Sequence, residues 1–203
     1  MREAPRKSWN PFQSRYASLV HTTGQRPRNL ILIGFMGTGK TTIGKQVARS
    51  LGFRFVDTDA LISKEAGKSI SKIFEDSGEE VFRDLETEVL KECGEQENQV
   101  ISTGGGIVTR EENIKILKAS GYVIWLKASP QIIYDRVRRN SKRPLLQVKD
   151  PRQTIIDLLE VRDELYRKAQ HLSINTDELT MDETCFGVTE STKLALGLGQ
   201  GLA

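Results

Sequence analysis

Short apolar runs alternate with longer amphipathic stretches along most of this chain. Five runs have the length of buried strands, at 30–33, 53–56, 100–102, 122–126 and 172–174. Between and after them, apolar residues recur at helical spacing, and helices are expected at 42–49, 60–66, 69–76, from 78 onward, after 109, at 129–139, at 151–168 and after 180. Strands that alternate with helices favour a parallel sheet covered on both faces. The pattern therefore predicts an α/β domain built on five parallel strands.

Local signals set several of the expected helix boundaries. Gly67 is expected to end one helix, and Gly78 to separate the next short helix from a longer one. Thr109 and Glu112 have the spacing of a capping box at the start of a helix. The stretch 140–150 is polar, basic and irregular, and Pro151 follows it as a helix start. We interpret 140–150 as a mobile loop between two helices.

A glycine-rich turn joins the first strand to the first helix. Residues 34–41 have the sequence G-F-M-G-T-G-K-T, which fits the phosphate-binding pattern G-x-x-x-x-G-K-[ST]. In this strand–loop–helix setting, backbone N–H groups and the helix N-terminus favour a bound phosphate. Lys40 would reach the β- and γ-phosphates, and the hydroxyl of Thr41 would occupy one Mg²⁺ position. The sequence therefore predicts a nucleoside triphosphate site.

Two carboxylates follow the second strand, in the sequence Asp57-Thr58-Asp59. Ligands of open parallel sheets bind at the carboxyl ends of the strands, where these side chains are expected. One acid could hold Mg²⁺ through water, and the other could accept a proton from an attacking hydroxyl or orient it. The alternative is an ordinary turn in which Asp59 caps the next helix. The neighbouring phosphate loop favours the catalytic interpretation.

Spacing alone does not decide whether several other residues contact a ligand. Three glycines at 104–106 follow the third strand and would let a ligand approach the backbone closely. Arg83 and Glu86 lie one helical turn apart, as a surface ion pair also would. Arg162 on a later helix and Arg143 in the irregular stretch could be ligand contacts or plain surface charges.

Charge distribution separates a leading segment from the rest of the 203-residue chain. Residues 1–29 hold six basic residues and one acidic residue, a net charge of +5, while the whole chain carries +3. The remainder is therefore slightly acidic, which argues against a nucleic-acid-binding core. We expect a flexible basic extension at 1–29, a globular domain at 30–196 and a disordered glycine-rich tail at 197–203. The extension could be an organelle transit peptide, a disordered tail or the product of a misassigned start codon.

Two further properties restrict the class of protein. The two cysteines, Cys93 and Cys185, lie far apart and without a metal-binding spacing, which is typical of a reducing compartment. Apolar runs do not approach the roughly 20 residues of a membrane span. We expect no membrane association and no nucleic-acid partner.

Taken in order, the motifs resemble the shikimate kinase family. They are G-F-M-G-T-G-K-T-T, D-T-D, F-R-D-L-E, S-T-G-G-G, R-P-L-L and R-D-E-L-Y, between about 30 and 176. The resemblance implies a three-layer P-loop kinase fold of the nucleoside monophosphate kinase type, with a mobile lid. It implies phosphorylation of the 3-hydroxyl of shikimate by ATP with Mg²⁺, a step towards chorismate and the aromatic amino acids. A monomer in the cytoplasm is expected, or in a plastid if the extension is a transit peptide.

The resemblance also implies roles for individual residues. Catalysis would depend on Asp59, Lys40 and Arg143. The shikimate contacts would be Asp59, Arg83, the Gly105 backbone and Arg162, and the Mg²⁺ contacts Thr41 and Asp57. The ATP contacts would be Gly37, Thr38, Gly39, Lys40, Thr41, Thr42, Arg136 and the lid residue Arg143. Glu86 would hold Arg83 in place. Residues 175–178 depart from the family because they lack an arginine expected near the adenine.

Two alternatives remain open. Another small-molecule kinase of the same fold, such as a gluconate or adenylate kinase, would share the phosphate loop, although the combination of D-T-D with G-G-G argues against gluconate. A nucleotide-binding module without catalytic activity is disfavoured because Lys40, Thr41 and both aspartates are present.

Overall fold

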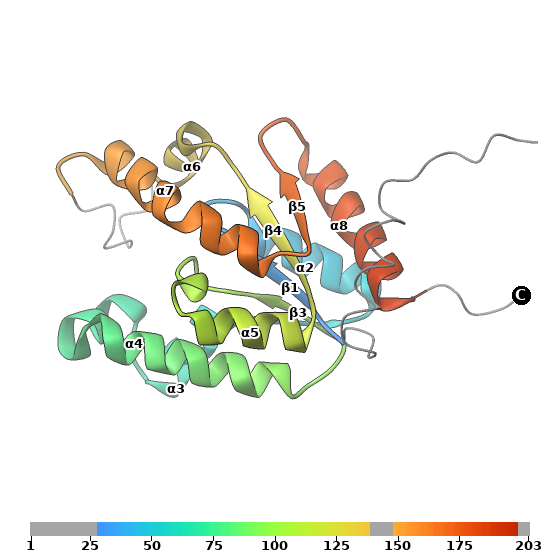
Figure 1. Cartoon of the computed structure of the whole chain (residues 1–203), viewed down its shortest axis with the longest axis horizontal. Coiled ribbons are helices and arrows are strands. Elements are labelled where there is room, and N and C mark those ends of the chain that lie inside the picture. Colours follow the sequence, from blue (N-terminus) through green and yellow to red (C-terminus); the bar gives the residue numbers. More distant parts are fainter. Residues whose placement is uncertain (1–27, 139–147, 199–203) are drawn as a thin grey trace, which may run out of the picture.

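The computed structural model describes residues 28–138 and 148–198, which form one sheet with helices on both of its faces (Figure 1). The strands are β1 (Leu30–Ile33), β2 (Arg54–Asp57), β3 (Gln99–Ser102), β4 (Tyr122–Lys127) and β5 (Leu172–Asn175). The helices are α2 (Lys40–Leu51), α3 (Thr58–Glu65), α4 (Ile70–Gly94), α5 (Glu111–Ser120), α6 (Pro130–Val137), α7 (Pro151–Ala169) and α8 (Met181–Leu196), with a 3₁₀ turn, η1 (Ile107–Thr109). The predicted fold class is confirmed. Most of the predicted lid, most of the extension and most of the tail lie outside the described residues.

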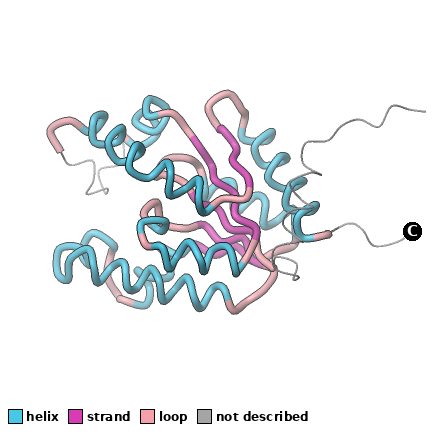
Figure 2. Tube along the Cα trace, viewed as in Figure 1, coloured by secondary structure: helices cyan, strands magenta, loops and turns pink. Residues whose placement is uncertain are grey.

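All five strands run parallel, in the order β2-β3-β1-β4-β5. Figure 2 shows the strands, in magenta, lying between the helices. The first strand lies at the centre, where Leu32 is in register with Ser102 of β3 and Ile33 with Trp125 of β4. On the far side of β3, Asp57 at the end of β2 is in register with the same Ser102. The carboxyl ends of these strands therefore meet at one edge, where ligands bind in open parallel sheets.

The central strand contributes to two separate hydrophobic layers. Ile31 and Ile33 pack with α4, α5 and α7, whereas Leu30 and Leu32 pack with α2 and α8 on the opposite face. All four side chains are fully buried. A strand with both faces covered has a continuous apolar sequence, which explains why L-I-L-I predicts β1 so well.

Capping side chains set the helix starts next to the sheet edge. Asp57 is the N-cap of α3, and its carboxylate accepts a hydrogen bond from the backbone N–H of Ala60. The alternative cap, Asp59, lies instead in the first turn of that helix. Thr180 and Glu183 form a full capping box at the start of α8.

Two local predictions for the middle of the chain have different outcomes. Gly78 interrupts α4 with a φ of 81°, so the predicted break is confirmed. The capping box at Thr109 is wrong, because that hydroxyl donates to the carbonyl of Gly106 and Thr109 ends η1. Helix α5 begins at Glu111, after Arg110, without a side-chain cap. The hydroxyl of Thr109 closes the tight turn after the three glycines, so it cannot also cap the following helix.

Asn29 belongs to the packed domain, although the sequence analysis assigns it to the extension. Its amide nitrogen donates to the carbonyls of Gln96 and Ser120, and its amide oxygen accepts from the N–H of Gln99. The residue is fully buried. These bonds tie the start of β1 to the loops on either side of it. Among the described residues, no helix is both long and apolar enough to cross a lipid bilayer.

Candidate active site

The phosphate loop has backbone geometry that requires glycine. Gly34, Gly37 and Gly39 have φ angles of 140°, 79° and 91°, in a region that other residues rarely adopt. Gly39 is the N-cap of α2, so the loop leads directly to the N-terminus of that helix. Lys40 folds back over the loop, and its ammonium group donates to the carbonyls of Gly34 and Phe35, each at 2.8 Å. These bonds hold the cationic end of Lys40 over the loop.

Hydroxyl and carboxylate oxygens meet beside this loop. The Thr41 hydroxyl donates to Asp57 Oδ2 at 2.9 Å and lies 3.5 Å from the hydroxyl of Ser102. The register of β2 and β3 brings Asp57 and Ser102 side by side. Ser102 is a site residue that was not predicted, although its position at the end of a buried strand, two residues before the glycines, is a usable signal.

This oxygen cluster suits Mg²⁺ bound together with a nucleotide. Mg²⁺ prefers hard oxygen ligands and keeps several waters, so it usually takes only one or two protein groups plus phosphate oxygens. Thr41 and Asp57 supply such groups. Within 28–138 and 148–198, no group of three or more His, Cys, Asp or Glu residues could hold a metal ion. The two oxygen groups of Thr41 and Asp57 fit a metal ion that also takes ligands from phosphates.

A cleft of about 430 Å³ runs along this edge of the sheet and collects most of the predicted residues. Its lining includes Gly37, Thr38, Gly39, Lys40, Thr41, Thr42, Asp57, Asp59, Gly105 and Arg136. Arg83 and Arg162 do not line it but contact the glycine turn at its end. Arg143 lies outside the described residues.

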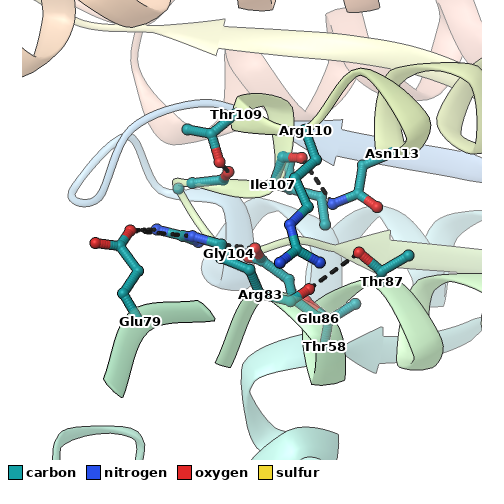
Figure 3. A network of polar contacts seen from close by, with 12 residues as sticks. Thr58, Glu79, Arg83, Glu86, Thr87, Gly104, Ile107, Thr109, Arg110 and Asn113 are labelled. Carbon is teal, nitrogen blue, oxygen red and sulfur yellow. Dashed lines mark hydrogen bonds and ion pairs between the residues drawn. The ribbon is translucent and has the colours of Figure 1, made fainter. Parts of the chain in front are cut away.

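Arg83 is held between two carboxylates of its own helix (Figure 3). Its Nη1 donates to Glu86 Oε2 at 2.7 Å, and its Nε and Nη2 both donate to Glu79 Oε1, at 3.2 and 2.9 Å. Glu86 is completely buried, and this burial raises the pKa of its carboxyl group, with Arg83 acting in the opposite direction and Asp59 adding to the rise. The predicted pair of Arg83 and Glu86 is present, and Glu79 is a partner that the sequence analysis did not identify.

The glycine turn lies directly against these charged groups. A Cβ on Gly104 would come within 2.5 Å of Glu86 Oε1 and 2.7 Å of Asp59 Oδ1. A Cβ on Gly106 would overlap the guanidinium of Arg83. The backbone N–H of Gly104 also donates to the Thr58 hydroxyl at 3.3 Å. Glycine is needed here because side chains would displace the carboxylates and the arginine.

The carbonyl of Gly105 is fixed by two residues of α7. Arg162 Nη1 donates to it at 3.3 Å, and the hydroxyl of Tyr166 also donates to it. Tyr166 is fully buried and stacks on Trp125, with ring centroids 5.3 Å apart. Burial raises the pKa of its hydroxyl, which keeps the proton available for this bond. The sequence analysis gave Tyr166 no role, because its partner is a backbone atom 61 residues away in the chain.

At the other end of the cleft, Arg136 connects two loops. Its Nη1 donates to the carbonyl of Gly37 at 3.2 Å and to the Thr176 hydroxyl at 3.3 Å. Thr176 belongs to the segment that lacks the arginine expected from the family. The partly exposed side chains of Leu179 and Met181 line the cleft beside it. This end therefore offers one guanidinium and two apolar side chains to a bound group.

Comparisons with known proteins point to one family. The family model for shikimate kinase matches residues 36–193. Curated shikimate kinases of Thermodesulfovibrio yellowstonii and Caldanaerobacter subterraneus are 49% and 46% identical over 156 residues, covering 77% of this chain and 90% and 91% of theirs. A solved shikimate kinase of Acinetobacter baumannii in complex with shikimate is 36% identical, with a TM-score of 0.79, covering 94% of this chain and 99% of that one. A gluconokinase of Sinorhizobium meliloti is 18% identical, with a TM-score of 0.51 over 86% of this chain and 97% of that one, and shares the fold alone. This chain belongs to the shikimate kinase family.

Proposed function

We propose that this chain transfers the γ-phosphoryl group of ATP to the 3-hydroxyl of shikimate, with Asp59 at the reacting hydroxyl. The observation that carries the proposal is the position of Asp59. It lines the cleft that contains Lys40 and the phosphate loop, and its Oδ1 borders Gly104 on the side of Glu86 and Arg83. This position, between the phosphate loop and the linked side chains of Glu86 and Arg83, supports the role proposed for Asp59.

The nucleotide half of the site would bind and neutralise the triphosphate. The backbone N–H groups of the loop and the N-terminus of α2 favour the phosphates, and Lys40 would move from its two carbonyl partners to phosphate oxygens. Thr41 and Asp57 would hold Mg²⁺, which supplies positive charge to the phosphates when it is bound. Arg136, Leu179 and Met181 would border the adenine.

The acceptor half would recognise a small carboxylate that carries hydroxyl groups. Arg83 and Arg162 can each form two parallel hydrogen bonds to a carboxylate. Gly105 would contribute its backbone, which Arg162 and Tyr166 hold in place. Asp59 would then accept the proton of the attacking hydroxyl or orient that hydroxyl towards the phosphate.

The assignment of the acceptor is tested by measuring ADP release with shikimate, gluconate and AMP in parallel. We expect turnover with shikimate. Activity with gluconate or AMP, and none with shikimate, would contradict the proposal. Asp59→Asn keeps the size of the side chain and removes its charge, so kcat should fall by roughly 10²–10⁴-fold while ATP still binds. An unchanged kcat would remove Asp59 from the reaction.

Two further expectations follow from the family. The chain should act as a monomer, which size-exclusion chromatography with light scattering can check. We also expect it to act in the cytoplasm, and fractionation of the source cells would distinguish this from an organelle.

A further inference from the structure

The guanidinium of Arg83 contacts two carboxylates and the backbone of Gly106, and these contacts differ in how easily they can break. Glu86 is completely buried beside Nη1, and the backbone of Gly106 lies against the terminal nitrogens. Glu79 alone is exposed, with 61% of its side-chain surface accessible, against 9% for Arg83. The edge formed by Nε and Nη2 is therefore the one whose partner can move into water.

This edge has the geometry with which an arginine recognises a carboxylate. Two neighbouring N–H groups of a guanidinium point in parallel and match the two oxygens of a carboxylate. Both donors at this edge now converge on a single oxygen, Glu79 Oε1. Figure 3 shows Glu79 reaching the guanidinium from the side opposite the other labelled residues of the network. An internal carboxylate thus takes the position of an external one.

The charges around the acceptor site make this contact unfavourable once an acceptor binds. Asp59 and Glu86 balance Arg83 and Arg162. Glu79 adds one negative charge, and the carboxylate of an acceptor would add another. Two carboxylates competing for one guanidinium edge repel each other, so one of them must leave. Glu79 can leave readily because its own surroundings are solvent.

We propose that Glu79 is a placeholder for the carboxylate of the acceptor, a positioning residue that acts through Arg83. In the empty site it holds the guanidinium in place by the Nε and Nη2 edge, and it yields this edge when the acceptor arrives. The inference rests on the proposed function, because it takes the acceptor to be a carboxylate bound by Arg83. Its consequence is that the protein binds its acceptor more weakly than the same site would without Glu79.

The substitution Glu79→Gln tests this competition without removing the side chain. An ion pair with one partner open to solvent contributes about 0.2–1 kcal/mol, so the Kd and KM for shikimate should fall by about 1.4- to fivefold. The value of kcat should stay within about twofold, because Arg83 is not at the reacting atoms. Glu80→Gln is the matched control. It removes the same charge from the next residue, which pairs with Arg110 instead, and should leave the affinity for shikimate unchanged.

An acceptor without a carboxylate shows whether Glu79 competes with the acceptor carboxylate for Arg83 or affects the site in some other way. The methyl ester of shikimate cannot form the carboxylate pair, so its Kd, measured by calorimetry, should be the same for the wild type and Glu79→Gln. A higher or unchanged KM for shikimate in Glu79→Gln would contradict the proposed role of Glu79. So would a gain in affinity for the ester that equals the gain for shikimate. If the wild type does not turn over shikimate at all, the proposed function itself has failed.

Discussion

Gly104 offers the sharpest test of how closely the acceptor site is packed. Its φ is not in the positive region, so alanine is compatible with the backbone, and the effect of Gly104→Ala is steric. The added methyl group would lie 2.5 Å from Glu86 Oε1 and 2.7 Å from Asp59 Oδ1, well inside ordinary contact distance. Glu86 is completely buried, whereas Asp59 is only partly buried, so we expect Asp59 to be the carboxylate that moves.

The expected effects follow from that displacement. A shift of about 1 Å in a reacting group can reduce a rate by about 100-fold, so kcat with shikimate should fall by roughly 10- to 100-fold. Overpacking of this kind costs about 1–3 kcal/mol of folding free energy. Affinity for ATP should be retained, because Gly104 is on the acceptor side of the cleft. Coupled ADP release, calorimetry with a nucleotide and thermal unfolding measure the three quantities.

Gly187→Ala is the matched control for the same chemical change. Gly187 lies in the interior of α8, and a Cβ there would meet nothing within 4 Å. Alanine should therefore stabilise the protein by up to about 1 kcal/mol and leave activity unchanged. If Gly104→Ala behaves like Gly187→Ala, with wild-type kcat and KM, the close contact between Gly104 and the two carboxylates has no bearing on catalysis.

Three further predictions concern parts of the structure that support the site. Tyr166→Phe removes only the hydroxyl that donates to Gly105, so it should cost about 1 kcal/mol and raise the KM for shikimate; a wild-type KM would separate this bond from acceptor binding. Asn29→Ala removes the three hydrogen bonds of a buried side chain and should lower the free energy of unfolding by about 2–4 kcal/mol, measured with denaturant. Deletion of residues 1–27 should leave kcat unchanged. A stable Asn29→Ala variant together with an inactive deletion variant would refute a domain that begins at about residue 28. Burial lowers the pKa of His171 to about 4, from 6.5 in the unfolded chain, because the folded protein favours the neutral ring. The contribution of the neutral ring to the free energy of unfolding is therefore complete above pH 6.5 and is lost as the pH falls towards 4. Urea unfolding from pH 7 to 4 should show that loss, on the order of 2–3 kcal/mol, and His171→Gln should show less of it.

The sequence predicts the sheet well because the pattern and the packing agree there. Residues 30–33 and 122–126 are apolar throughout, as a strand buried on both faces must be, and both are observed as strands. The glycines of the phosphate loop and Gly78 were also predictable, since their positive φ angles leave few other residues. Thr109 shows the limit of local patterns. Its capping box competes with a turn closed by Gly106, and the turn wins.

Site residues can be predicted from the sequence where their place after a strand already puts them at the ligand-binding edge of the sheet. Asp57 and Asp59 come at the end of a strand beside the phosphate loop, and both line the cleft. Contacts that depend on long-range packing could not be predicted in the same way. Tyr166 bonds to a carbonyl on another element, and Ser102 approaches Thr41 through strand register. Glu79 has the right spacing to pair with Arg83, but spacing alone does not distinguish such a pair from a surface ion pair.

The central position of β1 has a consequence for how such enzymes diversify. The predicted phosphate residues lie in the loop that follows β1, while the proposed acceptor residues lie on α3, α4, the glycine turn and α7. If these roles hold, substitutions in the second group should change the acceptor without disturbing the phosphate loop. A redesign for a new acceptor should therefore begin at Arg83, Arg162 and the residues facing Gly105, and leave β1 and its loop intact.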